Sequence, residues 1–203
     1  AFVRSASDDM LEAWMIRELT ERLDEADFRA GWIKLSVGDE GISPLEERVL
    51  RAAARASVRT GAVIGSHTAR GREALAQIDI LGAEGCPAER FIWIHTQKEA
   101  DTGLHDEAAA RGAWIEYDHV SRDPDAEVCA LILRALGAGH LRQLLISHDV
   151  GWFDPAKPGG GVQRPYTHLS DVMLPMMRAA GVEEEALRIL THDNPFDAYA
   201  RPA

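Results

Sequence analysis

The sequence repeats one pattern five times: a short apolar run that turns polar only at its last residues, followed by a stretch that favours a helix. The polar residues that end the five runs are Lys34, His67, His95, Asp118 and Asp149, separated by 33, 28, 23 and 31 positions. Each separation is about the length of one strand and helix unit, roughly 30 residues. Apolar strands that alternate with helices predict a parallel sheet covered by helices, either open or closed into a barrel.

Hydrophobic periodicity and cap residues locate the individual elements. Ser43, Pro44 and Glu46 form a capping box with proline at the first helical position. No strand is followed by the G-x-G-x-x-G loop of a dinucleotide-binding fold, and the glycine run 159–161 is expected to be a flexible loop. The predicted strands lie within 31–41 and at 62–68, 90–96, 113–119 and 143–149. The predicted helices lie at 5–23, 43–60, 72–84, 104–111 and 123–136, before a closing helix, a turn at 194–195 and a short final helix.

Lys34 lies inside an apolar run, where an ammonium group without a partner would be costly. Such a lysine is paired, has a lowered pKa, or has been chemically changed. One interpretation is an ion pair with Glu116, which lies in a similar strand. The other is reaction with carbon dioxide, because a carbamate is anionic and can bridge two cations. The neighbouring strand ends supply donors that suit zinc, manganese, iron or cobalt, namely His67, His95 and Asp149.

Composition disfavours some partners. The 203 residues carry a formal net charge of −11, which argues against a nucleic-acid partner because phosphate backbones need a basic face. No apolar run approaches 18 residues, so no membrane association is expected. Cys86 and Cys129 form neither a disulfide framework nor a metal motif, which favours a reducing, cytoplasmic location. The length fits a single domain over residues 1–203.

Several motifs together carry a family resemblance. They are G-W-I-K at 31–34, R-A-A-A-R-A-S-V-R-T-G at 51–61, S-H-T at 66–68, I-H at 94–95, I-E-Y-D-H at 115–119, L-L-I-S-H-D at 144–149 and N-P-F at 194–196. In order and spacing they resemble the phosphotriesterase-related branch of the amidohydrolase superfamily, which includes phosphotriesterases and lactonases. The resemblance covers nearly the whole chain.

The resemblance implies both a fold and a site. The fold would be a closed (β/α)8 TIM barrel with two divalent metal ions at its carboxyl-terminal mouth. Lys34 would be a carboxylated lysine bridging the metals, His67 and His95 would bind the second metal, and Asp149 would bind the first. A metal-bridging hydroxide would attack an ester carbonyl or a phosphorus centre, with Asp149 taking up its proton. Asp118 would orient a group beside the ligands, and zinc is the first choice of metal, with manganese, iron or cobalt as alternatives.

Two features depart from the family pattern. The family's first strand carries a His-x-His pair that completes the first metal site, and no such pair occurs here. By the resemblance, the first three strands are absent and the chain supplies strands four to eight, about five βα units. The natural protein would then be longer, or another chain would supply the remainder. The text T-Q-K-E-A-D at 96–101 also replaces the glycine- and serine-containing text expected after His95.

The segment after the last strand is rich in glycine, proline and aromatic residues and resembles the family's substrate-covering loop. A loop that only packs on the surface is the alternative. The residues expected to contact substrate are Trp152, Phe153 and Tyr166, which could wall an apolar group, and Lys157 and Arg164, which could meet an anionic group.

The remaining histidines are predicted to play no part in the site. His148 precedes Asp149 in its strand and should point to the opposite face. His119 follows Asp118 and can lie at the mouth, but no spacing supports metal binding. The histidines expected to be solvated or to cap helices are His105, His140, His168 and His192.

The leading hypothesis is therefore a binuclear metal-dependent hydrolase that opens lactones, with side activity on organophosphate triesters. Its partner would be a small-molecule ester or lactone, and a homodimer is expected. One alternative is a hydrolase of phosphorylated sugar lactones. Another is a catalytically incomplete half-barrel that acts as an assembly or binding partner. Dihydroorotase-like and urease-like relatives also use carboxylated lysine, but the text at 51–57 and 144–149 argues against them.

Overall fold

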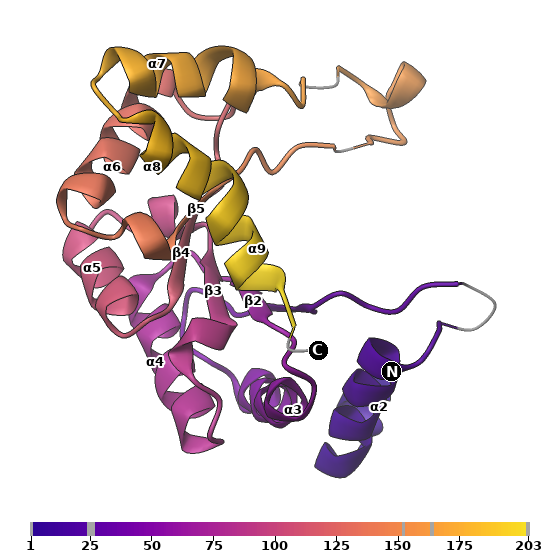
Figure 1. Cartoon of the computed structure of the whole chain (residues 1–203). Coiled ribbons are helices and arrows are strands. Elements are labelled where there is room, and N and C mark those ends of the chain that lie inside the picture. Colours follow the sequence, from indigo (N-terminus) through magenta and orange to yellow (C-terminus); the bar gives the residue numbers. More distant parts are fainter. Residues whose placement is uncertain (1, 24–26, 152, 163–164, 202–203) are drawn as a thin grey trace.

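The computed structural model describes residues 2–23, 27–151, 153–162 and 165–201. Its centre is one sheet of five parallel strands that pair in the order in which they occur along the chain. This arrangement confirms the predicted parallel α/β fold, with five strands of a (β/α) barrel (Figure 1). The strands are β1 (Ile33–Ser36), β2 (Ile64–His67), β3 (Phe91–Ile94), β4 (Trp114–Tyr117) and β5 (Leu144–Ile146).

Helices cover one face of the sheet, as the alternation of strands and helices predicts (Figure 1). They are α3 (Pro44–Thr60), α4 (Gly71–Ala83), α5 (Thr102–Ala110) and α6 (Asp125–Gly137). The capping box at the start of α3 is confirmed, because the Ser43 side chain accepts from the Glu46 backbone N–H and Glu46 accepts from the Ser43 N–H. Short 3-10 helices span Ala88–Arg90, Thr96–Lys98, Leu141–Gln143 and Pro158–Gly160.

The R-A-A-A-R motif of α3 has a structural role. Its alanines are buried and let α3 pack closely on its neighbours. Arg51 and Arg55, one turn apart, both reach Glu84 of the next helix unit, at 2.8 and 3.1 Å. Arg55 also pairs with Glu12 at 2.8 Å, which joins α3 to the amino-terminal helix. This motif, which contributes to the family resemblance, therefore serves helix packing rather than catalysis or ligand binding.

The amino-terminal helix predicted within 5–23, with Ser7 as its N-cap, is α2 (Asp8–Thr20), and the Ser7 side chain caps it by accepting from the Met10 backbone N–H. A short separate helix, α1 (Phe2–Ser5), precedes it. The chain breaks at Ser7 because an N-cap residue adopts extended rather than helical backbone angles, here φ −70° and ψ 165°. The apolar stripe of α2 then packs against α3 through Leu11, Met15 and Leu19.

The carboxyl-terminal region contains α7 (Leu174–Ala179), α8 (Glu184–Arg188) and α9 (Asn194–Tyr199). The predicted turn at 194–195 is wrong: a wide π-helical turn over Ile189–Asp193 joins α8 to α9 with helical backbone angles throughout. The same kind of turn, Leu169–Met173, precedes α7 and Pro175. In both places a wider turn precedes a proline that lacks an N–H and would clash with a preceding carbonyl in a regular helix.

Side chains on the two faces of the sheet belong to different apolar clusters because neighbouring residues of a strand point in opposite directions. Phe91, Trp93 and Ile115 pack beneath the helices. Residues of the other face pack with α9, which lies on that side of the sheet (Figure 1). They include Val63, Ile92, Ile94, Trp114 and Leu145, together with Ala198 of α9.

Within the described ranges, β1 and β5 each pair on one side only, so both are edge strands. Lys34 was expected in a buried strand, and this expectation is wrong for the chain as described: its side chain is exposed. The physical reason is its position on edge strand β1, on the face opposite the buried Ile33. No helix in the described part of the chain is long and apolar enough to cross a lipid bilayer.

Gly65 provides a test of this packing because it lies where two large side chains meet above the sheet. A Cβ at this position would lie 2.4 Å from Cζ3 of Trp32 and 2.9 Å from Cδ1 of Ile94. We expect Gly65→Ala to lower the free energy of unfolding by about 1–3 kcal/mol, because neither neighbour can move without disturbing its own packing. Urea denaturation followed by circular dichroism measures the change.

Gly82→Ala is the matched control. Gly82 lies in α4 with open space around the position of its Cβ. Alanine should there raise the stability by up to about 1 kcal/mol, because alanine favours a helix more than glycine does. Equal effects of the two substitutions would contradict the described packing around Gly65.

Candidate metal centre

Polar side chains gather at the carboxyl ends of neighbouring strands. His95 follows β3, Asp118 and His119 follow β4, and Asp149 follows β5 by three residues. His67 is the last residue of β2. Because the strands are parallel and in sequence order, their ends form one rim, which is where (β/α) folds keep their functional groups.

Backbone strain is concentrated at this rim. Among the residues the structure describes, the non-glycine residues with positive φ are His95 at 68°, Ser121 at 70° and Asp149 at 45°. Side chains rarely tolerate this region, and strained backbone tends to occur at functional sites. Two of these three residues are predicted metal ligands, and the third lies in the loop after β4.

Asp118 holds His95 in place. Its carboxylate accepts from the His95 backbone N–H at 3.0 Å, contacts the ring Nδ1 at 2.8 Å and accepts from Gln97 Nε2 at 2.7 Å. Burial acts to raise the pKa of Asp118, but the bonds from His95 and Gln97 hold it below its ordinary value. An ionised carboxylate only accepts, so the proton of the His95 ring lies on Nδ1 and a lone pair is left on Nε2. The orienting role expected for Asp118 stays a prediction, and this contact is compatible with it.

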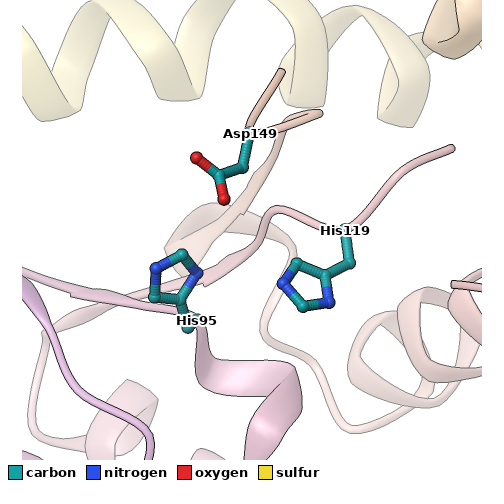
Figure 2. Close-up of side chains that lie close together, drawn as sticks. All are labelled: His95, His119 and Asp149. Atoms are coloured by element: carbon teal, nitrogen blue, oxygen red, sulfur yellow. The ribbon is translucent and has the colours of Figure 1, made fainter. Parts of the chain in front are cut away.

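His119 is the site residue that sequence reasoning missed. One ligand atom each from His95, His119 and Asp149 lie within 4.8 Å of one another, and Figure 2 shows the three side chains converging. The His119 Nδ1 contacts Asp123 at 2.7 Å. Its Nε2 is buried and makes no hydrogen bond within the described ranges, with Asp118 3.7 Å away. The only sequence signal was a histidine at a strand end with an aspartate four residues later.

This set of donors fits a divalent metal ion. Two imidazoles and one carboxylate are a common ligand set for zinc, iron and manganese. Both imidazoles are oriented by a carboxylate on the far ring nitrogen, as metal-binding histidines usually are. A buried imidazole nitrogen without a hydrogen-bond partner is costly unless something else satisfies it. A cation held by His95, His119 and Asp149 would do so.

His67 and Lys34 lie on the β1 side of this group. The rings of His67 and His95 meet edge to face with centroids 4.3 Å apart. Burial first, and then the nearness of the His95 ring, lower the pKa of His67. Lys34 and His67 line one pocket of about 500 Å³. Although Lys34 is exposed at the open edge, its surroundings exclude enough water to lower its pKa.

Glu116 is a buried acid on the same face as Lys34. It is 9% exposed, and its Oε1 accepts from the Ser147 hydroxyl at 3.0 Å. Burial, reinforced by the negative charge of Asp118, raises the pKa of Glu116 to about 7. No salt bridge joins Glu116 and Lys34, which both lie in the described part of the chain, so the ion pair left open by the sequence is not formed. The charge of Glu116 acts on Lys34 only through space, where it partly offsets the lowering of the Lys34 pKa by burial.

The substrate contacts predicted after β5 are described only in part. Trp152 and Arg164 lie outside the described residues. Phe153 and Tyr166 are 70% and 67% exposed. Lys157 is exposed and pairs with Asp154 of its own loop at 3.2 Å. The loop extends away from the sheet (Figure 1), so its role toward substrate stays a prediction.

Of the histidines predicted to lie outside the site, His148 matches its predicted role and His105 does not. His148 accepts from the Leu169 backbone N–H at 2.9 Å, which is the structural role predicted for it. The expectation that His105 is solvated or capping is wrong: it is fully buried and bonds the Tyr117 hydroxyl and the Glu99 carbonyl, each at 3.0 Å. It belongs to the buried face of α5, with Ala108 and Ala109, and its contact with Tyr117 of β4 is a tertiary contact that the local sequence does not reveal.

The fold and the strand-end residues together define a class, a (β/α) barrel scaffold with histidine and carboxylate donors at the carboxyl ends of its strands. The match to the phosphotriesterase family over residues 1–199 makes the assignment specific, and the chain belongs to that family. The predicted family resemblance is thus confirmed.

Named relatives support the same assignment. A phosphotriesterase homology protein from Mycobacterium tuberculosis is 29% identical over 202 residues, covering 95% of this chain and 62% of the relative. The structure of a lactonase from Listeria monocytogenes matches with a TM-score of 0.88 at 28% identity, covering 99% of this chain and 63% of that one. A mutant organophosphorus hydrolase from Deinococcus radiodurans matches with a TM-score of 0.85 at 30% identity, over 95% and 62%. The chain therefore spans less than two thirds of the length of these relatives.

The contact between Asp118 and His95 leads to a prediction about metal affinity. Asp118→Asn removes the charge that fixes the ring, so we expect the zinc dissociation constant to rise by about 10- to 100-fold. Competition with a chromophoric chelator measures it. Asp106→Asn is the matched control, because Asp106 also pairs with a histidine, His140 at 2.7 Å, but on the helix side of the sheet. Equal effects of the two variants would contradict the positioning role.

Glu116 predicts an unusual dependence of stability on pH. Its pKa is about 7 in the folded protein against 4.5 for the unperturbed group, so between these values the folded state holds a proton that the unfolded state has released. The free energy of unfolding should therefore fall as the pH rises through this window, by up to about 3 kcal/mol. Urea denaturation with a chelator present, from about pH 5 to about pH 8, measures the slope.

Glu116→Gln should remove this part of the slope, because glutamine stays neutral. The exposed Glu107, changed to glutamine, is the control and should leave the slope unchanged. Parallel pH profiles for the wild type and Glu116→Gln would show that Glu116 is ionised throughout.

Proposed function

We propose that this chain forms part of a metal-dependent hydrolase that opens lactones. The observation that carries the proposal is the group His95, His119 and Asp149, with a buried His119 nitrogen that lacks a partner within the described residues. The family match and the lactonase of similar structure support this choice of reaction. The lactonase title describes the Listeria protein, and its activity is extended to this chain only as a proposal.

The proposed ligands divide into two sets. His95, His119 and Asp149 would hold one cation. Lys34 and His67, which share a pocket beside His95, would hold a second cation if Lys34 is carboxylated. The lowered pKa of Lys34 supports carboxylation, because the neutral amine is the form that reacts with carbon dioxide. Zinc is the proposed metal, with manganese, iron or cobalt as alternatives.

Divalent cations would polarise the ester carbonyl and lower the pKa of water from 15.7 toward about 7. The residues of the chain would supply the rest. The Asp149 carboxylate would accept the proton of the attacking water, and its positive φ turns it toward the histidine group. Asp118, buried and held ionised, would keep the His95 ring fixed while charge develops at the carbonyl.

The proposed substrate is a small lactone or ester, with organophosphate triesters as a second class, as the Deinococcus hydrolase suggests. Phe153 and Tyr166 would cover its apolar part, together with Trp152. Lys157 and Arg164 would favour an anionic group, and phosphorylated sugar lactones are the variant of the proposal that uses them. A homodimer and a cytoplasmic location complete the proposal.

One observation favours a second candidate function. Within the described ranges, β1 is unpaired along its outer side and borders an open groove of about 350 Å³, whose lining includes Trp14, Met15, Trp32 and Leu35. An unpaired apolar edge favours association with another segment. By itself the chain would then be a binding or assembly unit. This candidate predicts that residues 1–203 alone form oligomers and bind zinc weakly, which gel filtration and metal analysis would reveal.

Removing predicted ligands tests the leading proposal. In the full-length protein, Lys34→Ala, His67→Ala and Asp149→Asn should each reduce bound zinc and lower kcat/KM for a lactone by about 100-fold or more, because both the metal and the proton acceptor act in the transition state. His140→Ala is the control, since His140 bonds Asp106 away from the rim. Metal analysis and a panel of lactones, cyclic amides and phosphotriesters measure the outcome.

The result that would end the proposal is unchanged metal content and lactone hydrolysis in Lys34→Ala and His67→Ala. Faster hydrolysis of cyclic amides than of lactones would keep the metal centre and replace the substrate class. Carboxylation of Lys34 has its own readout: zinc uptake by chelator-treated protein should be faster with added bicarbonate in the wild type and not in Lys34→Ala.

A further inference from the structure

Arg122 lies at the rim and has no part in the chemistry proposed above. Its guanidinium Nη1 donates a hydrogen bond to Oδ2 of Asp149, and the two side chains form an ion pair. Asp149 is the carboxylate of the group that could hold a metal ion. A positive charge therefore lies against the carboxylate that a divalent cation would also use.

The backbone holds Arg122 firmly in this position. The preceding Ser121 has a positive φ of 70°, as His95 and Asp149 do. The backbone N–H groups of Arg122 and Asp123 both donate to the His119 carbonyl, at 2.9 and 3.1 Å. The loop that presents His119 to the group thus also presents Arg122 to Asp149.

The three candidate metal ligands have partners of different charge. Carboxylates orient the two imidazoles, Asp118 for His95 and Asp123 for His119, and negative charge behind an imidazole favours a cation in front of it. Asp149 is instead paired with a cation. Two contacts therefore favour metal binding, and one competes with it.

We propose that Arg122 competes with the metal ion for Asp149 and so sets the metal affinity of the site. The inference rests on the proposed metal centre and adds a residue that opposes loading. An arginine suits this role because it stays charged at every physiological pH and matches a carboxylate in shape, so its competition does not depend on titration. A cation that binds must displace the guanidinium from Asp149 or share the carboxylate with it.

The competition should be modest in size. The side chains of Arg122 and Asp149 are each 31% exposed, and ion pairs that contact water contribute little because solvent screens them. Arg122→Gln should therefore lower the zinc dissociation constant by about two- to fivefold. Arg122→Lys keeps the charge but not the planar fork, and its dissociation constant should lie between those of the other two proteins.

The test measures zinc binding to the chelator-treated, full-length protein by competition with a chromophoric chelator. Arg142→Gln is the matched control, because Arg142 forms an exposed pair with Asp193, at 3.3 Å, away from the rim. Melting temperatures measured without metal check that all variants fold. Raising the salt concentration from about 0.05 M to about 0.5 M should narrow the difference between wild type and Arg122→Gln, because salt screens exposed charges.

A double-mutant cycle separates direct pairing from general repulsion. In an Asp149→Asn background, Arg122→Gln should change the zinc dissociation constant much less than in the wild type, because the paired carboxylate is gone. An equal change in both backgrounds would overturn the pairing.

An unchanged or higher dissociation constant in Arg122→Gln would overturn the competition while leaving the metal centre intact. If neither the wild type nor Arg122→Gln binds zinc, the proposed metal centre is overturned, and this inference with it.

Discussion

The in-order parallel pairing of the five strands is the constraint on which the site depends. Parallel neighbours need a helix between them, so every strand runs in one direction and all carboxyl ends reach one rim. The register then sets which residues are neighbours, and Ser36, His67, Ile94 and Glu116 follow one another across the sheet. Residues that are far apart in sequence therefore meet at the rim without any long-range contact of their own.

Two buried carboxyl groups, Glu116 in β4 and Asp118 directly after it, have pKa values shifted in opposite directions, and this difference suits each to a different use. Asp118 accepts three hydrogen bonds, which keep its pKa low, so it can act as a fixed negative charge behind His95. Glu116 receives one hydrogen bond, from Ser147, and burial beside Asp118 raises its pKa to about 7. Two neighbouring buried carboxylates cannot both ionise cheaply, so the one that accepts more hydrogen bonds is the one whose ionised form is favoured.

The sequence predicted the fold well because the signals for strands and caps are local. Five apolar runs, the capping box at Ser43 and the strand-end residues needed no knowledge of tertiary contacts. The site was predicted less completely. His119 and its partner Asp123 meet through a turn whose strained Ser121 has no sequence signature. The exposure of Lys34 follows from an open sheet edge, which depends on what pairs with β1 rather than on the residues of β1.

The number and placement of the donors favour catalysis over a structural role for the metal. Structural zinc sites usually have four protein ligands, whereas catalytic sites keep a position open for water or substrate. His95, His119 and Asp149 provide three donors from the ends of β3, β4 and β5. On the β1 side of this group lie His67, in ring contact with His95, and Lys34. Further ligands or a second cation would come from that side, whereas Arg122 lies against Asp149 on the other side.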